Sequence, residues 1–264
     1  MAASASSLEI ARVRNRSVVT SARSATPLRL LSPSGDGHAA WVYQSSLGGG
    51  FVGGDDVALR IDVTAGASLF LSSQASSKVY RGARSAFTLD VTVGEAATLV
   101  SWPDPVVCFA GAAFDQVQRF ALEPTANLVA VDAWTAGRIA RGERWTFERL
   151  STRLALAIGG ESVLHDATLV SGAHGELGTR FGELGAFATI VLAGPRLVEA
   201  CDRLAARVAT RALGWPLITA SRWPWGLVIR VGAAAGEPLA RASYDLLRSD
   251  VIGLLGADPW ARKW

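Results

Sequence analysis

Apolar residues in the middle of the chain come in short runs separated by turns. From Val57 to Val63, apolar and polar side chains alternate, and a second apolar run, Leu69–Leu71, follows a turn at Gly66. Alternation with a period of two is typical of a β-strand that buries one of its faces. This part of the chain is therefore predicted to form a strand, a tight turn and a second strand.

The same unit recurs along the chain. Turns at Gly66, Gly94, Asn127 and Gly160 each separate two strand-like runs, at intervals of about thirty residues. A unit of this kind cannot bury its apolar face alone, so successive units are expected to stack. The sequence therefore predicts a mainly β protein, with stacked and layered sheets and a β-helix-like path of the chain.

About two α-helices are predicted near the C-terminus. Apolar residues recur at helical spacing in 195–213 and in 238–255, and each segment has a proline near its start and a glycine beyond its end. Between the two segments, Trp223–Val231 is predicted to form a last strand.

Nothing in the composition marks a linker between two parts of the chain. We therefore predict one domain spanning residues 1–264. Its first segment, 1–26, is strand-like only around Leu8–Val13, so the sequence leaves the order of this segment open.

The most unusual stretch is Leu47–Asp56, which has five glycines between positions 48 and 54. Gly48–Gly53 matches the pattern G-x-G-x-x-G, but a dinucleotide site needs a strand before the glycines and a helix after them. Here the strand-like run from Val57 follows, so no nucleotide site is expected. Glycines in such a turn supply positive φ angles or allow a close approach of backbone.

Three motifs in this order carry a resemblance to a known family. The glycine stretch with Gln74–Arg81 after it, then Pro103–Ala112, then Ala136–Trp145, are similar to the signature of the urease accessory protein D family, also called the H family. The similarity is good over about 27–192 and looser in the last forty residues. The chain departs from the family in having serines at some positions where members often have threonines, which keeps the hydroxyl groups.

The resemblance implies both a fold and a role. Members are mostly β, with a β-helix-like arrangement and two helices. It also implies a scaffold without catalytic activity, which docks on the urease apoprotein and carries the F-type and G-type accessory proteins. The G-type partner is the GTPase, and the scaffold offers a path for nickel, which is carried in transit and not held as a tightly bound cofactor.

Composition agrees with a protein that has partners. Of all residues, 50% are hydrophobic, the mean hydropathy is +0.26 and nine are tryptophans, which indicates either a large core or apolar surface that a partner covers. The net charge is +3 and the arginines are scattered, so no nucleic-acid partner is expected. Met1–Ser7 lacks an apolar signal core, and the longest apolar run, Leu184–Ala193, is too short to span a membrane. A cytoplasmic location away from membranes is therefore predicted.

Dedicated catalytic and metal motifs are missing from the sequence. There is no G-x-S-x-G, C-x-x-C or H-x-x-x-H pattern, and Cys108 and Cys201 are too few for a disulfide framework. A protein that passes nickel onward needs sparse, weak ligands, because nickel stands high in the affinity order of divalent metals. The nearest approximations to ligands are His165, Asp166, His174 and Glu176.

The residues that we predict to contact a partner or a passing ion surround the glycine stretch. They form a polar rim in which Asp55 and Lys78 share one edge of the stacked strands, although a structural turn with a solvated ion pair is the alternative interpretation. The predicted contact residues are Gly50, Gly53, Asp55, Gln74, Lys78 and Tyr80.

Two other functional classes stay open at this point. A small hydrolase with an unrecognised site would have a closed pocket containing a titratable pair with shifted pKa values. A stand-alone β binding module would have neither such a pocket nor urease partners.

Overall fold

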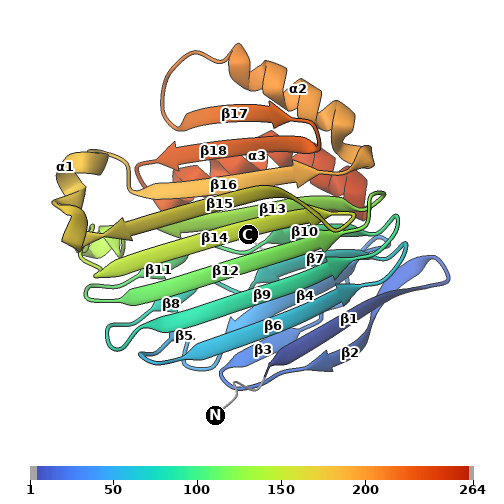
Figure 1. Ribbon diagram of the computed structural model, residues 1–264, viewed down its shortest axis with the longest axis horizontal. Helices are drawn as coiled ribbons and strands as arrows, with labels where there is room; N and C mark the ends of the chain where they lie inside the picture. Colours follow the sequence, from blue (N-terminus) through green and yellow to red (C-terminus); the bar gives the residue numbers. More distant parts are fainter. Residues whose placement is uncertain (1–4, 262–264) are drawn as a thin grey trace.

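Successive stretches of the chain stack on one another as the coils of a β-solenoid (Figure 1). The computed structural model describes residues 5–261. Each coil contributes a strand to an 11-stranded sheet, a short strand to a side wall of that sheet, and a strand to a 7-stranded sheet. Parallel pairing joins successive coils, so Trp41 lies beside Phe70 and Leu99 lies beside Leu128. The predicted mainly β, layered architecture with a β-helix-like path is confirmed.

The strands fall into three groups by position. The 7-stranded sheet has the spatial order β15 (Glu161–Ser171), β14 (Arg149–Ile158), β12 (Ala113–Leu122), β9 (Ser85–Val93), β6 (Asp56–Val63), β1 (Ser6–Val13) and β2 (Arg16–Arg23). The main path of the 11-stranded sheet runs through β17 (Leu217–Trp223), β18 (Gly226–Ala233), β16 (Ala186–Ala193), β13 (Asn127–Thr135), β10 (Thr98–Trp102), β7 (Ser68–Ser73), β4 (Ala40–Ser46) and β3 (Leu28–Leu31). The side wall consists of β5 (Gly50–Phe51), β8 (Lys78–Val79) and β11 (Val106–Cys108).

Burial along the strands explains the two hydrophobic patterns in the sequence. β6 and β9 alternate between buried and more exposed side chains, because only one face of the 7-stranded sheet packs against the core. Every residue of β7, β10 and β13 is buried. One face of these strands packs on the core inside the coils, and the other packs against helices. Strands that are covered on both faces read as continuous apolar runs.

Helices cover the outer face of the 11-stranded sheet. α3 (Gly236–Leu255) packs against β7, β13, β16 and β18 through an apolar face that includes Leu247 and Val251, and α2 (Val198–Ala209) packs against β17 and β18. The remaining helical elements are short: α1 (Leu177–Phe181), η1 (Ile139–Arg141), η2 (Gly172–His174) and η3 (Pro195–Leu197). Within residues 5–261, none of the helices has the length and apolar character that crossing a membrane requires.

The two predicted helices are present with shifted ends. The segment 195–213 begins as η3, and α2 ends at Ala209 rather than near Gly214, with Thr210 as its C-cap residue; the Thr210 hydroxyl donates to the carbonyl of Ala206 at 3.1 Å. α3 begins two residues earlier than predicted and ends where expected, with Gly256 at φ 76°. α1 was not predicted, since five residues are too few to show a helical period.

The turn at Gly160 separates two strands as predicted but differs from the three earlier turns, and the prediction of a single last strand is wrong. The turn at Gly160 does not carry the chain between the sheets: Gly159 and Gly160 both have positive φ angles, and β14 and β15 form an antiparallel hairpin within one sheet. The predicted strand Trp223–Val231 is split, because Pro224–Trp225 forms the turn of a second hairpin, between β17 and β18.

The N-terminal segment, whose order the sequence left open, extends the solenoid. Strand β1 pairs in parallel with β6, and β2 pairs antiparallel with β1, so residues 6–23 continue the 7-stranded sheet beyond the first coil. Residues 1–4 of this segment lie outside the described part of the chain.

The glycine stretch contains β5 of the side wall and the turns that connect it to β4 and to β6. Positive φ angles occur at Gly48, Gly49 and Gly54, but Gly50 and Gly53 have none. A Cβ atom on Gly50 would lie 2.3 Å from the carbonyl oxygen of Lys78, and one on Gly53 would lie 2.8 Å from the amide nitrogen of Ala83. Gly50 and Gly53 are therefore needed for the close approach of neighbouring coils and not for an unusual φ angle.

We predict that Gly50→Val destabilises the protein, since its side chain would enter the space of the Lys78 backbone, which cannot move without breaking the pairing of β5 and β8. The expected loss in the free energy of unfolding is about 1–3 kcal/mol or more. Urea unfolding of the purified variant measures it.

Gly214→Val is the matched control. Gly214 has an ordinary φ angle and nothing lies within 4 Å of its Cβ position, so a change of about 0.5 kcal/mol or less is expected. Equal unfolding midpoints for the two variants would show that a side chain at Gly50 does not lower the free energy of unfolding.

Candidate functional site

The residues predicted to contact a partner or an ion lie at the side wall and its corners. Gly50 pairs with Lys78 across β5 and β8, and the amide of Tyr80 donates to the carbonyl of Phe51 at 2.9 Å. The amide of Gln74 donates to the carbonyl of another coil's strand, and its side chain is exposed. The structure thus brings these residues to one side of the molecule, and their contact with a partner stays a prediction.

Asp55 and Lys78 do not form the ion pair that a shared edge would allow. The carboxylate of Asp55 instead accepts a hydrogen bond from the amide of Val52 at 2.8 Å and fixes the corner of the glycine stretch. Among the ion pairs of residues 5–261, none includes Asp55 or Lys78. Lys78 is exposed.

The four weak metal candidates are not gathered into one site. His165 and Asp166 are neighbours in β15 and point to opposite faces of the sheet, with His165 exposed. His174 and Glu176 are exposed next to α1, where Glu176 accepts a hydrogen bond from the hydroxyl of Thr179. In the described part of the chain, no group of three or more His, Cys, Asp or Glu side chains could hold a metal ion.

Polar side chains do converge in a place that the sequence reading missed, between the two sheets. In the 7-stranded sheet, Gln116 of β12 is beside Thr152 of β14. In the 11-stranded sheet, Asp132 of β13 is beside Thr189 of β16, which is in turn beside Arg230 of β18. Gln118 of β12 and Asp166 of β15, both in the 7-stranded sheet, extend the row that these side chains form. We call this row the polar lane: Gln116, Gln118, Asp132, Thr152, Asp166, Thr189 and Arg230.

Asp132 is the centre of the polar lane. Only 4% of its surface is exposed, and its carboxylate accepts hydrogen bonds from Gln116, at 2.7 Å, and from Thr152. The pKa of Asp132 is raised from 3.8 to about 6, chiefly because burial disfavours the charged form; the negative charge of Asp166 adds to the rise, and the hydrogen bonds from Thr152 and Gln116 oppose it. A carboxylate in this position is a strong local acceptor for a proton or a cation.

The outer end of the lane is closed by an ion pair. Asp166 of β15 accepts a hydrogen bond from the hydroxyl of Thr189 at 3.3 Å and forms an ion pair with Arg230. Arg230 also donates to Thr189, at 3.3 Å. The guanidinium side chain is 55% exposed, whereas the Asp166 side chain is 11% exposed, so the pair joins the interior to the surface.

The inner end of the lane meets a cavity of about 180 Å³. Gln116, Gln118 and Asp132 line it on one side, and the segment 73–78 that follows β7 lines it on the other. Within residues 5–261, the Nε2 atom of Gln118 and the hydroxyl of Ser101 in this wall are buried without a hydrogen-bond partner. These groups suit water or a small hydrated ion, and the volume is sufficient for several water molecules.

One sequence signal could have revealed the lane. Asp132 interrupts an otherwise apolar run from Leu128 to Trp134, and an aspartate in a strand that is buried on both faces is rare without a partner or a function. The partners themselves come from other strands, and only the register of the sheets brings them together.

The two cysteines have no place in this site. Burial raises the pKa of Cys108 to about 12 and that of Cys201 to about 11, so both remain protonated and unreactive near neutral pH.

We predict that Asp132→Asn stabilises the protein at neutral pH and not at acid pH. The unfolded chain releases this proton near pH 3.8 and the folded chain retains it until about pH 6, so a rise in pH across this interval lowers the free energy of unfolding of the native protein. The asparagine variant lacks this effect. Its advantage over the native protein should grow by about 2–3 kcal/mol between about pH 4 and pH 7 in urea unfolding. A difference that does not change with pH would contradict a raised pKa at Asp132.

Comparison with known proteins places the chain in a family. The profile of the UreD urease accessory protein family matches residues 3–262. Urease accessory protein UreD of Sorangium cellulosum is 44% identical over 261 residues, covering 97% of this chain and 83% of the relative. UreD of an Anaeromyxobacter species is 42% identical over 270 residues, covering 98% and 89%, and urease accessory protein D of Oryza sativa subsp. indica is 34% identical over 297 residues, covering 98% and 96%. The resemblance carried by the glycine stretch and the two later motifs is confirmed, and the chain belongs to the UreD urease accessory protein family.

Proposed function

We propose that this chain is a non-enzymatic factor for the maturation of urease in the cytoplasm. In this proposal it docks on the urease apoprotein together with the F-type and G-type accessory proteins and helps to deliver nickel to the urease active site. Support comes from relatives named urease accessory protein that align with nearly the whole chain. The observation that carries the role in nickel delivery is the buried Asp132 carboxylate within the polar lane.

The chemistry of the lane suits passage of a cation better than retention. Its oxygen donors are the carboxylates of Asp132 and Asp166 and the hydroxyls of Thr152 and Thr189, each from a different strand. Imidazole and thiolate groups, which hold nickel more firmly than these oxygens, are missing from the lane. Ligands of this kind bind a nickel ion briefly and release it, because a stable site needs several ligands held in place by surrounding hydrogen bonds.

Arg230 sets a condition for passage through the outer end. Its guanidinium group is ion-paired with the carboxylate of Asp166, so a nickel ion can bind Asp166 only when the guanidinium moves away. Contact with a carboxylate of a docked partner would favour that movement. The proposed route is therefore closed in the isolated chain and opens in the assembly.

We predict that the isolated protein binds nickel weakly, because its candidate oxygen ligands are few and His165, His174 and Glu176 are dispersed. Equilibrium dialysis should give substoichiometric nickel at micromolar free metal. One firmly held ion per chain under these conditions would contradict transit and indicate a storage site.

We predict that Asp132→Asn lowers urease activation in cells by about tenfold or more, since the amide keeps the shape of the carboxylate and loses its charge. The assay is urease activity and nickel content of urease purified from cells that carry the urease genes and either the native or the variant chain. Asp56→Asn, which changes an exposed aspartate of β6, is the matched control and should activate normally.

The outcomes separate two kinds of failure. Normal activation by Asp132→Asn would remove the lane from the route of nickel. Normal activation in cells that lack this chain altogether would contradict the maturation role itself.

A further inference from the structure

Three loops of successive coils meet at one corner of the molecule, beside the side wall. They are 80–84 between β8 and β9, 109–112 between β11 and β12, and 136–148 between β13 and β14. The middle loop lies between the other two. The amide of Gly111 donates to the carbonyl of Thr146 at 2.9 Å, and the Cβ of Arg81 lies 3.6 Å from the Cβ position of Gly111.

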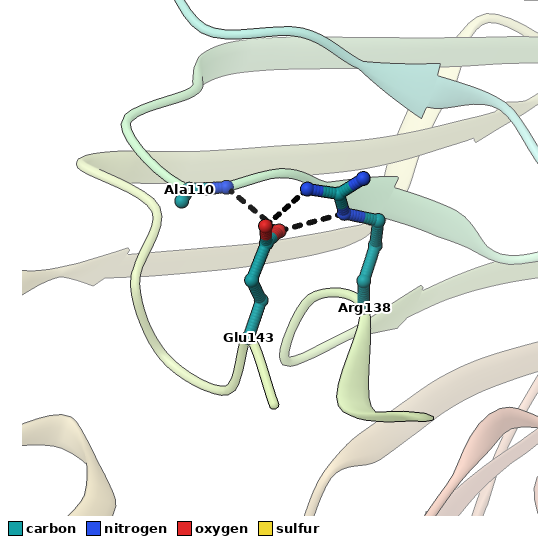
Figure 2. Close-up of polar contacts among 3 residues, drawn as sticks. All are labelled: Ala110, Arg138 and Glu143. Atoms are coloured by element: carbon teal, nitrogen blue, oxygen red, sulfur yellow. Dashed lines mark hydrogen bonds and ion pairs between the residues drawn. The ribbon is translucent and has the colours of Figure 1, made fainter. Parts of the chain in front are cut away.

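An ion pair within the third loop orders it, and both partners also contact the second loop (Figure 2). Arg138 donates from Nε to Glu143 at 2.7 Å and forms a second, parallel contact from its terminal nitrogen. Glu143 also accepts from the amide of Ala110 at 3.3 Å, and the guanidinium carbon of Arg138 lies 4.0 Å from the centre of the Phe109 ring. The hydrogen bond from Arg138 lowers the pKa of Glu143, so this carboxylate stays charged and occupied by its partner. The ring of Tyr80 packs edge-on against Phe109 at 5.1 Å.

Two acidic groups of this corner are paired, a third, Glu148, is exposed without an ion pair in the described part of the chain, and several cations are also unpaired. Glu143 is paired with Arg138, and Asp115 is paired with Arg84 and with Arg149. Lys78, Arg81 and Arg141 are exposed, and none of them takes part in an ion pair of residues 5–261. We call Lys78, Arg81 and Arg141 the basic corner.

We propose that the basic corner docks an acidic segment of a partner protein. Guanidinium groups bind carboxylates through two parallel hydrogen bonds, and Arg81 and Arg141 are borne by loops that the Arg138–Glu143 pair and the coil-to-coil hydrogen bonds hold in place. Loops that are ordered before binding lose little conformational freedom on docking. The partially exposed Tyr80, which lies between Lys78 and Arg81 in the sequence, adds an aromatic surface.

A nucleic acid is a poorer fit to the same surface. Proteins that bind nucleic acid through phosphates typically use about six to ten such contacts along a stripe, and the basic corner offers three cations around an aromatic cluster. Charge complementarity therefore favours a partner with a few aspartates or glutamates, and the attraction should weaken as salt concentration rises.

The test compares two double variants with the same change in net charge. Arg81→Glu/Arg141→Glu reverses the basic corner. Arg153→Glu/Arg207→Glu reverses two exposed arginines elsewhere, one on β14 and one on α2, which likewise form no ion pair within residues 5–261. All four positions are at the surface, so both proteins should fold, and thermal melting checks this.

The first measurement is binding of a fluorescent oligoglutamate peptide at low and at physiological ionic strength. The native protein and the Arg153→Glu/Arg207→Glu variant should bind alike and more weakly in higher salt, and the Arg81→Glu/Arg141→Glu variant should bind about tenfold or more weakly. Equal binding by the two variants, no binding by the native protein, or tighter binding of a single-stranded oligonucleotide than of the peptide would each overturn the proposal.

The second measurement is urease activation in cells, and it rests on the proposed function. The Arg81→Glu/Arg141→Glu variant should lose about tenfold in activation relative to the control variant. Normal activation by this variant, in cells where deletion of the chain abolishes urease activity, would overturn the docking role and leave the maturation role intact. Normal activity after deletion of the chain would overturn both.

Discussion

The fold depends on backbone hydrogen bonding between successive coils in one fixed register. Because side chains alternate between the two faces of a strand, a slip of one residue would move every core residue of a strand to the opposite face. The register brings backbone so close at the side wall that Gly50 has no room for a Cβ atom beside Lys78. The same register aligns Gln116 with Thr152 and places the polar groups of different coils side by side.

Because β13 of the 11-stranded sheet is buried on both faces, placing a charged side chain in it costs desolvation free energy. Asp132 lies in this strand, where the hydrogen bonds from Gln116 and Thr152 offset only part of the cost of removing the carboxylate from water. A buried group that reduces stability at neutral pH is more readily explained by a role in function than by a role in folding. The polar lane joins this group to Asp166 and Arg230 at the surface.

The space between the two sheets and the loop corner beside the side wall differ in chemical character. Between the sheets, polar groups line a cavity of about 180 Å³, while at the corner of the loops three cations are exposed and two of the neighbouring acidic groups, Glu143 and Asp115, are paired. We propose that the first serves the passage of nickel and the second the docking of a protein partner. Both follow from stacking, since coils of similar length place their loops at the same corner and their polar strand positions in the same row.

The sequence by itself determined the local structure. Period-two alternation, recurring turns and the helical spacing before Gly256 were sufficient for the layered sheets and the two longer helices, because these patterns reflect contacts within a few residues. The family resemblance could also be recognised from the sequence, since each of its three motifs is one continuous segment. Only the tertiary structure decided how the strands on either side of Gly160 and of Pro224 pair. It also showed that Gly50 is needed for the close approach of the Lys78 backbone and not for a positive φ angle. It alone assembled the polar lane and the basic corner, because most of their members come from different coils and meet only through the register of the sheets.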